Sequence, residues 1–206
     1  MRSAVAELIR ALLAEQPGRV VVGITGAPGA GKSTVARALV GEFAPEAAYL
    51  PMDGFHLSNA QLGSLGLRER KGAPETFDVD GYETTLRRVA AAYGDRDVYV
   101  PEFDRAIEES IAAGLVVPRD ARLVITEGNY LAYWPRIRAL LDRLYYLDVG
   151  ATVRRRRLLE RHITGGRTPR DAEAWVDAVD EANGALIAAT KAACDAVLEP
   201  DDQAGS

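Results

Sequence analysis

The segment from Gly26 to Ser33, Gly-Ala-Pro-Gly-Ala-Gly-Lys-Ser, constrains the fold of this chain more than any other feature. The apolar run at residues 19–24 before it predicts a buried strand, and the apolar spacing of residues 33–43 after it predicts a helix. Between a strand and a helix, glycines let backbone N–H groups turn towards a phosphate at the positive end of the helix. With its spacing and both flanks intact, the segment is better explained as a phosphate-binding loop than as an incidental turn. We therefore predict a nucleoside triphosphate site.

Two side chains of this loop have separate predicted roles. Lys32, expected on an exposed part of the loop, adds a positive charge for the outer phosphates, and the Ser33 hydroxyl is suited to bind Mg²⁺. ATP and Mg²⁺ are accordingly the expected cofactors. The predicted nucleotide-binding residues of the loop are Gly26, Ala27, Pro28, Gly29, Ala30, Gly31, Lys32, Ser33 and Thr34.

The composition limits where the chain can act. With 206 residues, 48% of them hydrophobic and 27% charged, it has the size and balance of one soluble globular domain, residues 1–206. A net charge of −5 gives no excess of positive charge that would favour binding of nucleic acid. No apolar run approaches the ~20 residues of a membrane span, and Glu7 within the first apolar run argues against a signal peptide. The single cysteine, Cys194, excludes a disulfide framework. We expect a cytoplasmic protein that binds neither nucleic acid nor membrane.

Strands and helices are expected to alternate along the chain. Residues 107–117 could form a hairpin arm, Asp80 to Glu83 resembles a capping box, and Thr168 with Pro169 predicts a later helix start. This alternation predicts an α/β fold of three layers, with a mainly parallel sheet, helices on both faces and ligands beyond the carboxyl ends of the strands. The short strands predicted after the loop cover residues 47–52, 98–101, 122–126, 143–147 and 196–198.

Two carboxylates follow predicted strands and are expected at that same edge of the sheet. Asp53 comes directly after the strand at residues 47–52, and Glu127 directly after the strand at residues 122–126. Phosphoryl transfer to a hydroxyl needs a carboxylate that orients and deprotonates the hydroxyl, and acidic groups that hold Mg²⁺. Asp53 suits the first role and Glu127 the second. Because each precedes a glycine, either one alone could be a simple turn or strand end, but together with the loop they favour chemistry.

Three segments carry a family resemblance: the loop with its flanks at residues 23–34, Met-Asp-Gly-Phe-His-Leu-Ser-Asn at 52–59, and Thr-Glu-Gly-Asn-Tyr at 126–130. Together they resemble the uridine kinase, pantothenate kinase and phosphoribulokinase superfamily. More narrowly, they resemble its bacterial nucleoside/nucleotide kinase-like group, some of whose members are labelled fructose-transport-system kinases. The resemblance covers residues 20–198, and implies the P-loop NTPase fold with a catalytic base at Asp53 and a metal- and substrate-binding group at Glu127.

The departures from the family patterns leave the substrate open. A uridine kinase has Asp-Ser-Phe-Tyr where this chain has Asp-Gly-Phe-His at residues 53–56, and a pantothenate kinase is usually considerably longer. The resemblance implies an acceptor pocket formed by the segment after Asp53 and by Pro-Glu-Phe-Asp-Arg at residues 101–105. For some residues of this predicted pocket, a solvated loop, a structural ion pair or a core histidine is an equally good explanation. The predicted acceptor-binding residues are Asp53, His56, Arg70, Lys71, Asp78, Asp104, Arg105, Asn129 and Tyr130.

A helical lid is expected at about residues 154–170. Its four consecutive arginines cannot all face one side of a helix, but the helix leads into a Gly-Gly hinge and a further arginine. Such a lid excludes water and brings positive charge to the transition state. The resemblance points to Arg157, Arg161 and the catalytic candidate Arg167, of which about two should contact phosphates. Trp175 is expected in the core, and the Val-Asp-Glu-Ala-Asn segment at residues 179–183 receives no role.

These features predict a Mg²⁺- and ATP-dependent kinase that transfers the γ-phosphoryl group to a hydroxyl of a small polar metabolite. A nucleoside, a sugar and a pantothenate-like acid all remain open. One alternative is a kinase of a sugar phosphate, as in phosphoribulokinase, which would require Arg70, Lys71 and Arg105 to converge on the acceptor phosphate. Another is a regulatory NTPase without a small acceptor. A homodimer is left open.

Overall fold

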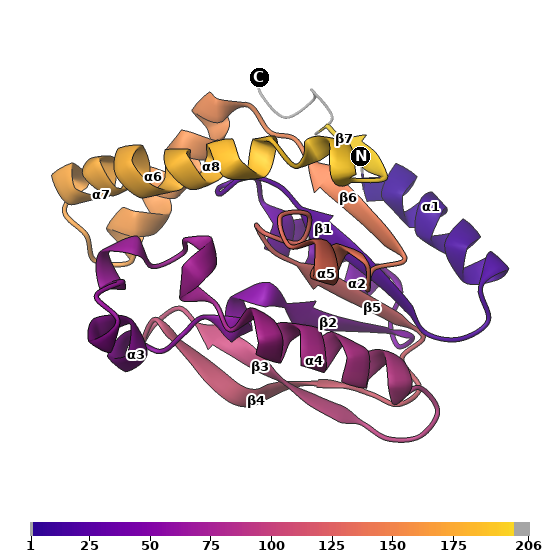
Figure 1. The fold of residues 1–206 in the computed structure, drawn as a ribbon. Coiled ribbons are helices and arrows are strands. Elements are labelled where there is room, and N and C mark those ends of the chain that lie inside the picture. Colours follow the sequence, from indigo (N-terminus) through magenta and orange to yellow (C-terminus); the bar gives the residue numbers. More distant parts are fainter. Residues whose placement is uncertain (1, 200–206) are drawn as a thin grey trace.

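A five-stranded sheet forms the centre of the computed structural model, which describes residues 2–199 (Figure 1). Its strand order is β2-β5-β1-β6-β7, and every pair is parallel. The three central strands are buried along nearly all of their length because helices cover both faces of the sheet. The strands are β1 (Val20–Thr25), β2 (Ala47–Pro51), β5 (Leu123–Glu127), β6 (Arg143–Leu147) and β7 (Ala196–Leu198).

The register of the strands brings the predicted acidic residues to one edge. Ile24 of β1 lies opposite Glu127 of β5, and Pro51 of β2 lies opposite Glu127 on its other side. The phosphate-binding loop leaves β1 at this edge, and Asp53 follows β2 within two residues. Three segments that are far apart in the sequence therefore meet at the carboxyl ends of three neighbouring strands.

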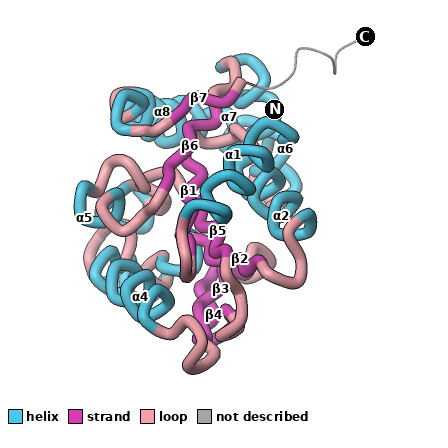
Figure 2. The backbone as a smooth tube through the Cα atoms, turned by 90° about the vertical axis from the view of Figure 1, so that its right-hand side faces the viewer, coloured by secondary structure: helices cyan, strands magenta, loops and turns pink. Residues whose placement is uncertain are grey.

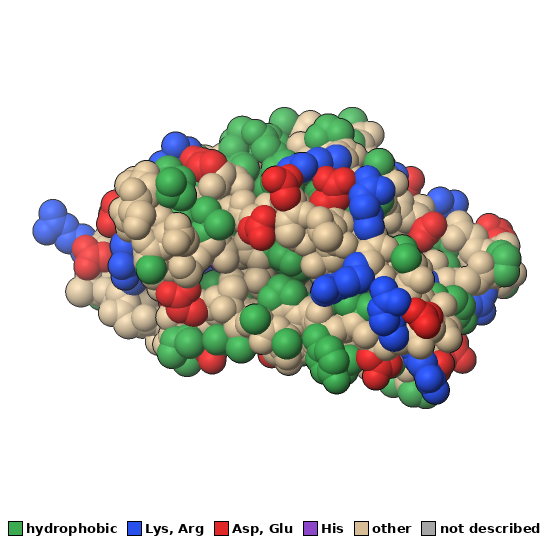
Figure 3. Space-filling model, turned by 60° about the horizontal axis from the view of Figure 1, so that its bottom comes forward, with side chains coloured by type: hydrophobic (Ala, Val, Ile, Leu, Met, Phe, Trp, Pro, Cys, Tyr) green, Lys and Arg blue, Asp and Glu red, His purple; other side chains and the backbone are tan. Residues whose placement is uncertain are grey.

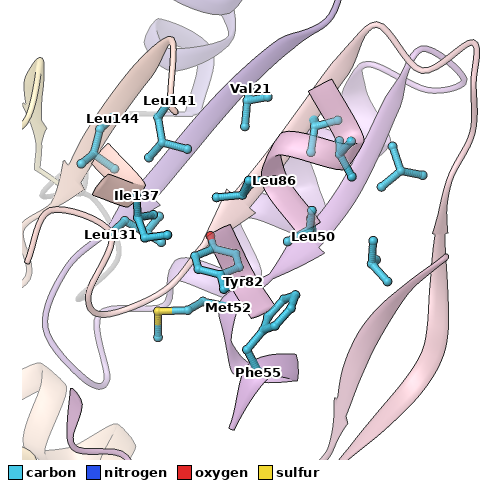
Figure 4. Close-up of a cluster of buried hydrophobic side chains, with 14 of the residues drawn as sticks. Val21, Leu50, Met52, Phe55, Tyr82, Leu86, Leu131, Ile137, Leu141 and Leu144 are labelled. Atoms are coloured by element: carbon cyan, nitrogen blue, oxygen red, sulfur yellow. The ribbon is translucent and has the colours of Figure 1, made fainter. Parts of the chain in front are cut away.

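Helices cover the two faces of this sheet (Figure 2). One face packs against α1 (Arg2–Glu15) and α2 (Lys32–Glu42), and the other against α4 (Val79–Ala91), α5 (Pro135–Arg138) and Ile187 of α8. The three-layer prediction is confirmed. On the second face, the buried side chains of α4 and α5 interdigitate with those of the strands (Figure 4). Each large apolar side chain removed from water in this way contributes roughly 1.5–3 kcal/mol.

Helix α4 begins two residues earlier than the capping-box pattern predicts. Its cap is Asp78, whose carboxylate accepts a hydrogen bond from the Gly81 N–H at 2.8 Å. The expected box residues are engaged elsewhere, since the carboxylates of Asp80 and Glu83 both pair with Arg136. Because the Asp78 carboxylate caps the start of the helix, the capping box predicted at residues 80–83 is not formed.

A two-stranded antiparallel hairpin, β3 (Val98–Asp104) and β4 (Glu109–Val117), lies beyond the β2 edge (Figure 1). It contains the hairpin arm predicted at residues 107–117, with a first strand longer than expected. The 3₁₀ turn Met52–Phe55 packs closely against this hairpin. The approach is so close that a Cβ on Gly54 would lie only 2.5 Å from the Pro101 carbonyl oxygen. Seen from the hairpin side, small apolar groups alternate with charged side chains on the surface (Figure 3).

The remaining elements form the rim around the carboxyl edge. After β2 come α3 (Asn59–Ser64) and the short 3₁₀ turns Arg68–Arg70 and Pro74–Thr76. After β6 come the elements of the predicted lid, with Thr168 capping α7 and Pro169 in its first turn, as expected. No helix within residues 2–199 is both long enough and apolar enough to cross a membrane. The predicted lid at residues 154–170 covers most of α6 (Ala151–Thr164) and the start of α7 (Pro169–Trp175). After it come a π-helical turn (Val176–Asp180), α8 (Glu181–Ala188) and a final 3₁₀ turn (Lys191–Ala193).

Candidate active site

The loop between β1 and α2 encloses the ammonium group of Lys32. Gly31 has a φ of +93°, a conformation that residues with a Cβ rarely adopt, and α2 begins at the next residue. Lys32 is buried, contrary to the expectation of an exposed position, and its Nζ donates to the carbonyl oxygens of Gly26 at 2.9 Å and Ala27 at 3.2 Å. Burial lowers the pKa of Lys32 to about 8, against the opposing effect of the nearby Glu127 and Asp53 carboxylates.

One carboxylate oxygen of Glu127 accepts hydrogen bonds from two hydroxyl groups. Its Oε1 accepts hydrogen bonds from Ser33 Oγ at 3.0 Å and from Tyr49 OH at 2.7 Å. Burial and the charge of Asp53 raise the pKa of Glu127, and burial raises that of Tyr49. Sequence reasoning missed Tyr49, which lies on the strand next to β5, opposite Ile125, two residues before the Glu127 position. Only the strand register, which the sequence does not give, could have identified it.

The oxygen atoms of Ser33 and Glu127 fit a magnesium ion. Mg²⁺ prefers hard oxygen ligands, and proteins usually supply one or two of them while phosphates and water complete the shell. Within residues 2–199, no group of three or more His, Cys, Asp or Glu side chains could hold a metal ion by itself. A metal ion bound to Ser33 and Glu127 would need further ligands, such as phosphate oxygens and water.

The Asp53 carboxylate stands at the end of β2 among positively charged groups. Arg105 Nη2 donates to its Oδ2 at 3.0 Å, and His56 Nδ1 donates to its backbone carbonyl at 2.8 Å. Burial would raise the pKa of Asp53, but the charges of His56, Arg105, Lys32 and others outweigh burial and hold that pKa below its usual value. Asp53 is thus ionised at neutral pH.

A cleft of about 1120 Å³ opens between the lid helices, the phosphate-binding loop and the segment after Asp53. It contains most of the predicted site residues from all three regions. Those that line it are Pro28, Gly29, Gly31, Lys32, Ser33, Thr34, Asp53, His56, Lys71, Arg105, Glu127, Asn129, Arg157, Arg161 and Arg167.

Four predicted acceptor residues lie outside the lining of this cleft. Arg70 is exposed and pairs with Glu75 at 2.6 Å, and Asp78 caps α4. Asp104 accepts the N–H of Ala106 within the hairpin turn, and Tyr130 is buried, its OH donating to the Gly72 carbonyl at 2.6 Å. Each has a structural partner that accounts for its position.

The two remaining cations of the acceptor side are already paired. Lys71 donates to Asn59 Oδ1 at 2.9 Å and to the Glu108 carbonyl, while Arg105 pairs with Asp53. Since Arg70 points away, the three cations do not converge as a sugar-phosphate pocket would require. His56 packs its ring against Phe77, with centroids 4.0 Å apart, at the wall of the cleft.

Lid arginines contact the outside of the phosphate-binding loop. Arg157 Nη1 donates to the carbonyl oxygens of Gly29 at 3.3 Å and Ala30 at 3.1 Å. Arg154, which sequence reasoning left among surface residues, donates to the Pro28 carbonyl at 3.3 Å. These bonds occupy carbonyl groups and leave the loop N–H groups for a phosphate.

Trp175 is not the core residue that its helical spacing suggested. It is half-buried and lines the cleft, and the Arg167 guanidinium lies over its ring at 3.9 Å from the centroid. A cation over an indole face at this distance is attracted by the ring. This contact links Arg167, which follows the Gly-Gly turn at the end of α6, to Trp175 at the end of α7.

Replacing Arg167 by alanine should lower turnover about tenfold while weakening nucleotide binding much less, because the charge of a lid acts chiefly when the lid is closed. Turnover and the nucleotide dissociation constant are measured in parallel, with Arg170→Ala on the exposed first turn of α7 as the control. Equal losses in both quantities would assign Arg167 to ground-state binding instead.

A phosphate-binding loop on a parallel sheet, with carboxylates at the same edge and a cationic lid, defines the class of P-loop kinases. The model of the Phosphoribulokinase / Uridine kinase family matches residues 21–202, and the chain belongs to this family. It is an ATP-dependent kinase.

Relatives and solved structures agree with this assignment. The chain is 36% identical, over 76% of its length and 72% of the relative's, to "Putative uridine kinase C227.14" of Schizosaccharomyces pombe. It is 32% identical to a pantothenate kinase of Parvibaculum lavamentivorans, over 72% of this chain and 49% of that one. The crystal structure of a "putative fructose transport system kinase" from Silicibacter sp. TM1040 is 34% identical, covers 96% of this chain and 98% of its own, and superimposes with a TM-score of 0.86.

Proposed function

We propose that this kinase transfers the γ-phosphoryl group of ATP, with Mg²⁺, to a hydroxyl of a small polar metabolite. The observation that carries the proposal is the ionised Asp53 carboxylate, which faces the same cleft as Lys32 and Glu127. A regulatory NTPase has no need of a carboxylate at the position where an acceptor hydroxyl would enter. The volume of the cleft, about 1120 Å³, leaves room for a nucleotide and a metabolite together.

In this proposal Asp53 is the general base. Its carboxylate accepts the proton of the acceptor hydroxyl while that oxygen forms a bond to the γ-phosphorus. The bond between the γ-phosphorus and the bridging oxygen breaks at the same time, and ADP leaves. Arg105, 3.0 Å from Asp53, keeps the carboxylate ionised and oriented.

The other side chains bind and neutralise the phosphates. Lys32 and the loop N–H groups hold the outer phosphates, and Ser33 with Glu127 would hold Mg²⁺. Bound there, Mg²⁺ would neutralise the charge that develops on the phosphate oxygens. Arg157, Arg161 and Arg167 of the lid add positive charge and exclude water.

The acceptor is proposed to carry no phosphate group of its own, since the three cations predicted to bind one do not converge: Arg70 lies outside the cleft, and Lys71 and Arg105 are paired. Arg68 of the same segment also lines the cleft. Names of the relatives point to a nucleoside, a pantothenate-like acid or a sugar. A cytoplasmic location and a homodimer, both considered from the sequence, remain predictions.

Acceptor-dependent ADP formation tests the proposal directly. Purified protein is supplied with Mg-ATP and a panel of nucleosides, sugars, sugar phosphates and pantothenate, with a matched reaction without acceptor. We expect at least one unphosphorylated alcohol to raise ADP formation well above the water rate. ATP turnover that no acceptor changes would favour the regulatory NTPase, and stimulation by sugar phosphates alone would favour the phosphoribulokinase-like alternative.

A further inference from the structure

The helix that follows the lid buries two polar side chains in its apolar stripe. Its buried positions include Val176, Asp180, Asn183 and Ile187, which recur every three or four residues. An unpaired carboxylate or amide would be costly there, so each must have a partner. None of the catalytic roles proposed above uses either of them.

Asp180 contacts two adjacent side chains of the lid helix α6. Its Oδ2 accepts a hydrogen bond from His162 Nε2 at 2.7 Å, and its Oδ1 lies 3.9 Å from Arg161 Nη2. The Asp180 side chain is only 8% exposed, whereas that of Arg161 is 44% exposed and reaches into the cleft. The fixed member of the pair is therefore Asp180, and the member that it can orient is Arg161.

Arg161 in turn lies within electrostatic reach of the chemistry. It shares the cleft lining with Asp53 and Lys32, and its charge contributes to the lowered pKa of both. The charges of Asp180 and Asp53 both act on that of Arg161, Asp180 more strongly than Asp53, and the proposed mechanism needs Asp53 for the acceptor hydroxyl. Asp180 thus keeps the guanidinium on the lid side of the cleft.

The position of Asp180 is set by an unusual piece of helix. Helices α7 and α8 are joined without a break by the π-helical turn Val176–Asp180, whose last residue is Asp180. Turns of this kind contain an extra residue, change the direction of the side chains after them, and occur frequently at functional sites. Here the turn places Asp180 against α6, and α6 lies beside α7 and α8 (Figure 1).

One helical turn after Asp180, the same helix contacts the acceptor side. Asn183 Nδ2 donates at 3.3 Å to the carbonyl of Gly72, which also accepts the Tyr130 hydroxyl at 2.6 Å. Gly72 follows Lys71 in the segment that lines the cleft. A single helix therefore contacts both a lid arginine and the acceptor segment.

We propose that Asp180 is a positioning residue for phosphoryl transfer, holding Arg161 at the phosphate side of the cleft from a helix that Asn183 fastens to the acceptor segment. This inference rests on the proposed kinase mechanism but not on the identity of the acceptor. In this proposal Asp180, which also lines the cleft, acts through Arg161.

A double-mutant cycle separates this role from a purely structural one. Asp180→Asn, Arg161→Ala and the double variant are compared with Asp177→Asn, which removes a carboxylate of the same π-helical turn that pairs with Arg155 at the surface. The readouts are the maximal rate of ADP formation, the nucleotide dissociation constant from calorimetry and the melting temperature. If no acceptor has been found, ADP formation with water as acceptor is used, so failure of the proposed function leaves this test intact.

Asp180→Asn should lower the maximal rate about tenfold while changing nucleotide affinity less than about threefold. In the Arg161→Ala background it should have almost no further effect, and Asp177→Asn should resemble wild type. Equal losses with and without Arg161, or an unchanged rate, would overturn the proposal. If Asp180→Asn does not fold, Asp180→Glu, which displaces the charge by one methylene, takes its place in the cycle. A loss of rate that depends on Arg161 then supports the proposal, and an equal loss without Arg161 or an unchanged rate overturns it.

Discussion

Asp53→Asn is expected to lower phosphorylation of the acceptor by about 10²–10⁴-fold, the usual contribution of a positioned base. Asparagine keeps the size of the side chain and can still accept the hydrogen bond from Arg105, which spans 3.0 Å in the wild type. It cannot take up the proton of the acceptor hydroxyl. The affinity for ATP and the melting temperature should change little, so the loss should be confined to the rate of acceptor phosphorylation.

Asp104→Asn is the matched control for this experiment. Asp104 lies on the neighbouring hairpin and accepts the Ala106 N–H, outside the lining of the cleft. Its variant should retain turnover within a few-fold of wild type. If Asp53→Asn were equally active, Asp53 would not be the base, and Glu127 would be the next carboxylate of the cleft to test.

Lys32→Ala should lower turnover by at least about 10³-fold, because the ammonium faces phosphate oxygens that gain charge in the transition state. In the free protein this group is held by the carbonyls of Gly26 and Ala27 at 2.9 and 3.2 Å. Circular dichroism and the melting temperature test whether the variant folds. A folded variant with near-normal turnover would contradict the assignment of the nucleotide site.

The affinity for ATP should also depend on pH through Lys32. Its pKa of about 8 means that the binding-competent ammonium form is nearly complete at about pH 7, is half lost at about pH 8 and is lost further as the pH rises. The dissociation constant of ATP should therefore rise by up to about tenfold per pH unit above pH 8. Calorimetry between pH 7 and 9.5 measures this, and Lys32→Ala should show no such rise.

The framework of the site was predictable because it depends on strand ends. A strand, a loop and a helix around residues 26–33 place a phosphate site, and parallel strands must bring their carboxyl ends to one edge. Asp53 and Glu127 could therefore be located without knowing the strand order. Tyr49 could not, because its approach to Glu127 depends on the register of β2 against β5.

The acceptor side was less predictable because irregular segments are oriented by distant contacts. Nothing local to residues 68–78 shows that Lys71 turns towards Asn59 and Glu108 while Arg70 turns towards Glu75. The π-helical turn interrupts the ordinary helical period, so a projection through residues 169–188 misplaces the residues beyond it. Asp180, the last residue of this turn, was consequently missed as a cleft residue. Trp175 lies before the turn and was assigned to the core because helical spacing does not show its contact with Arg167.

The tight contact between Gly54 and the hairpin has a consequence for comparing kinases of this kind. A Cβ at residue 54 would lie 2.5 Å from the Pro101 carbonyl oxygen, so no side chain fits there while the hairpin stays in place. A chain with Asp-Ser in this position, as in the uridine kinase pattern, must hold its hairpin farther from the strand that carries the base. The residue after Asp53, the proposed base, then acts as a spacer between β2 and the hairpin, and we expect the choice between glycine and serine to change the width of the acceptor side.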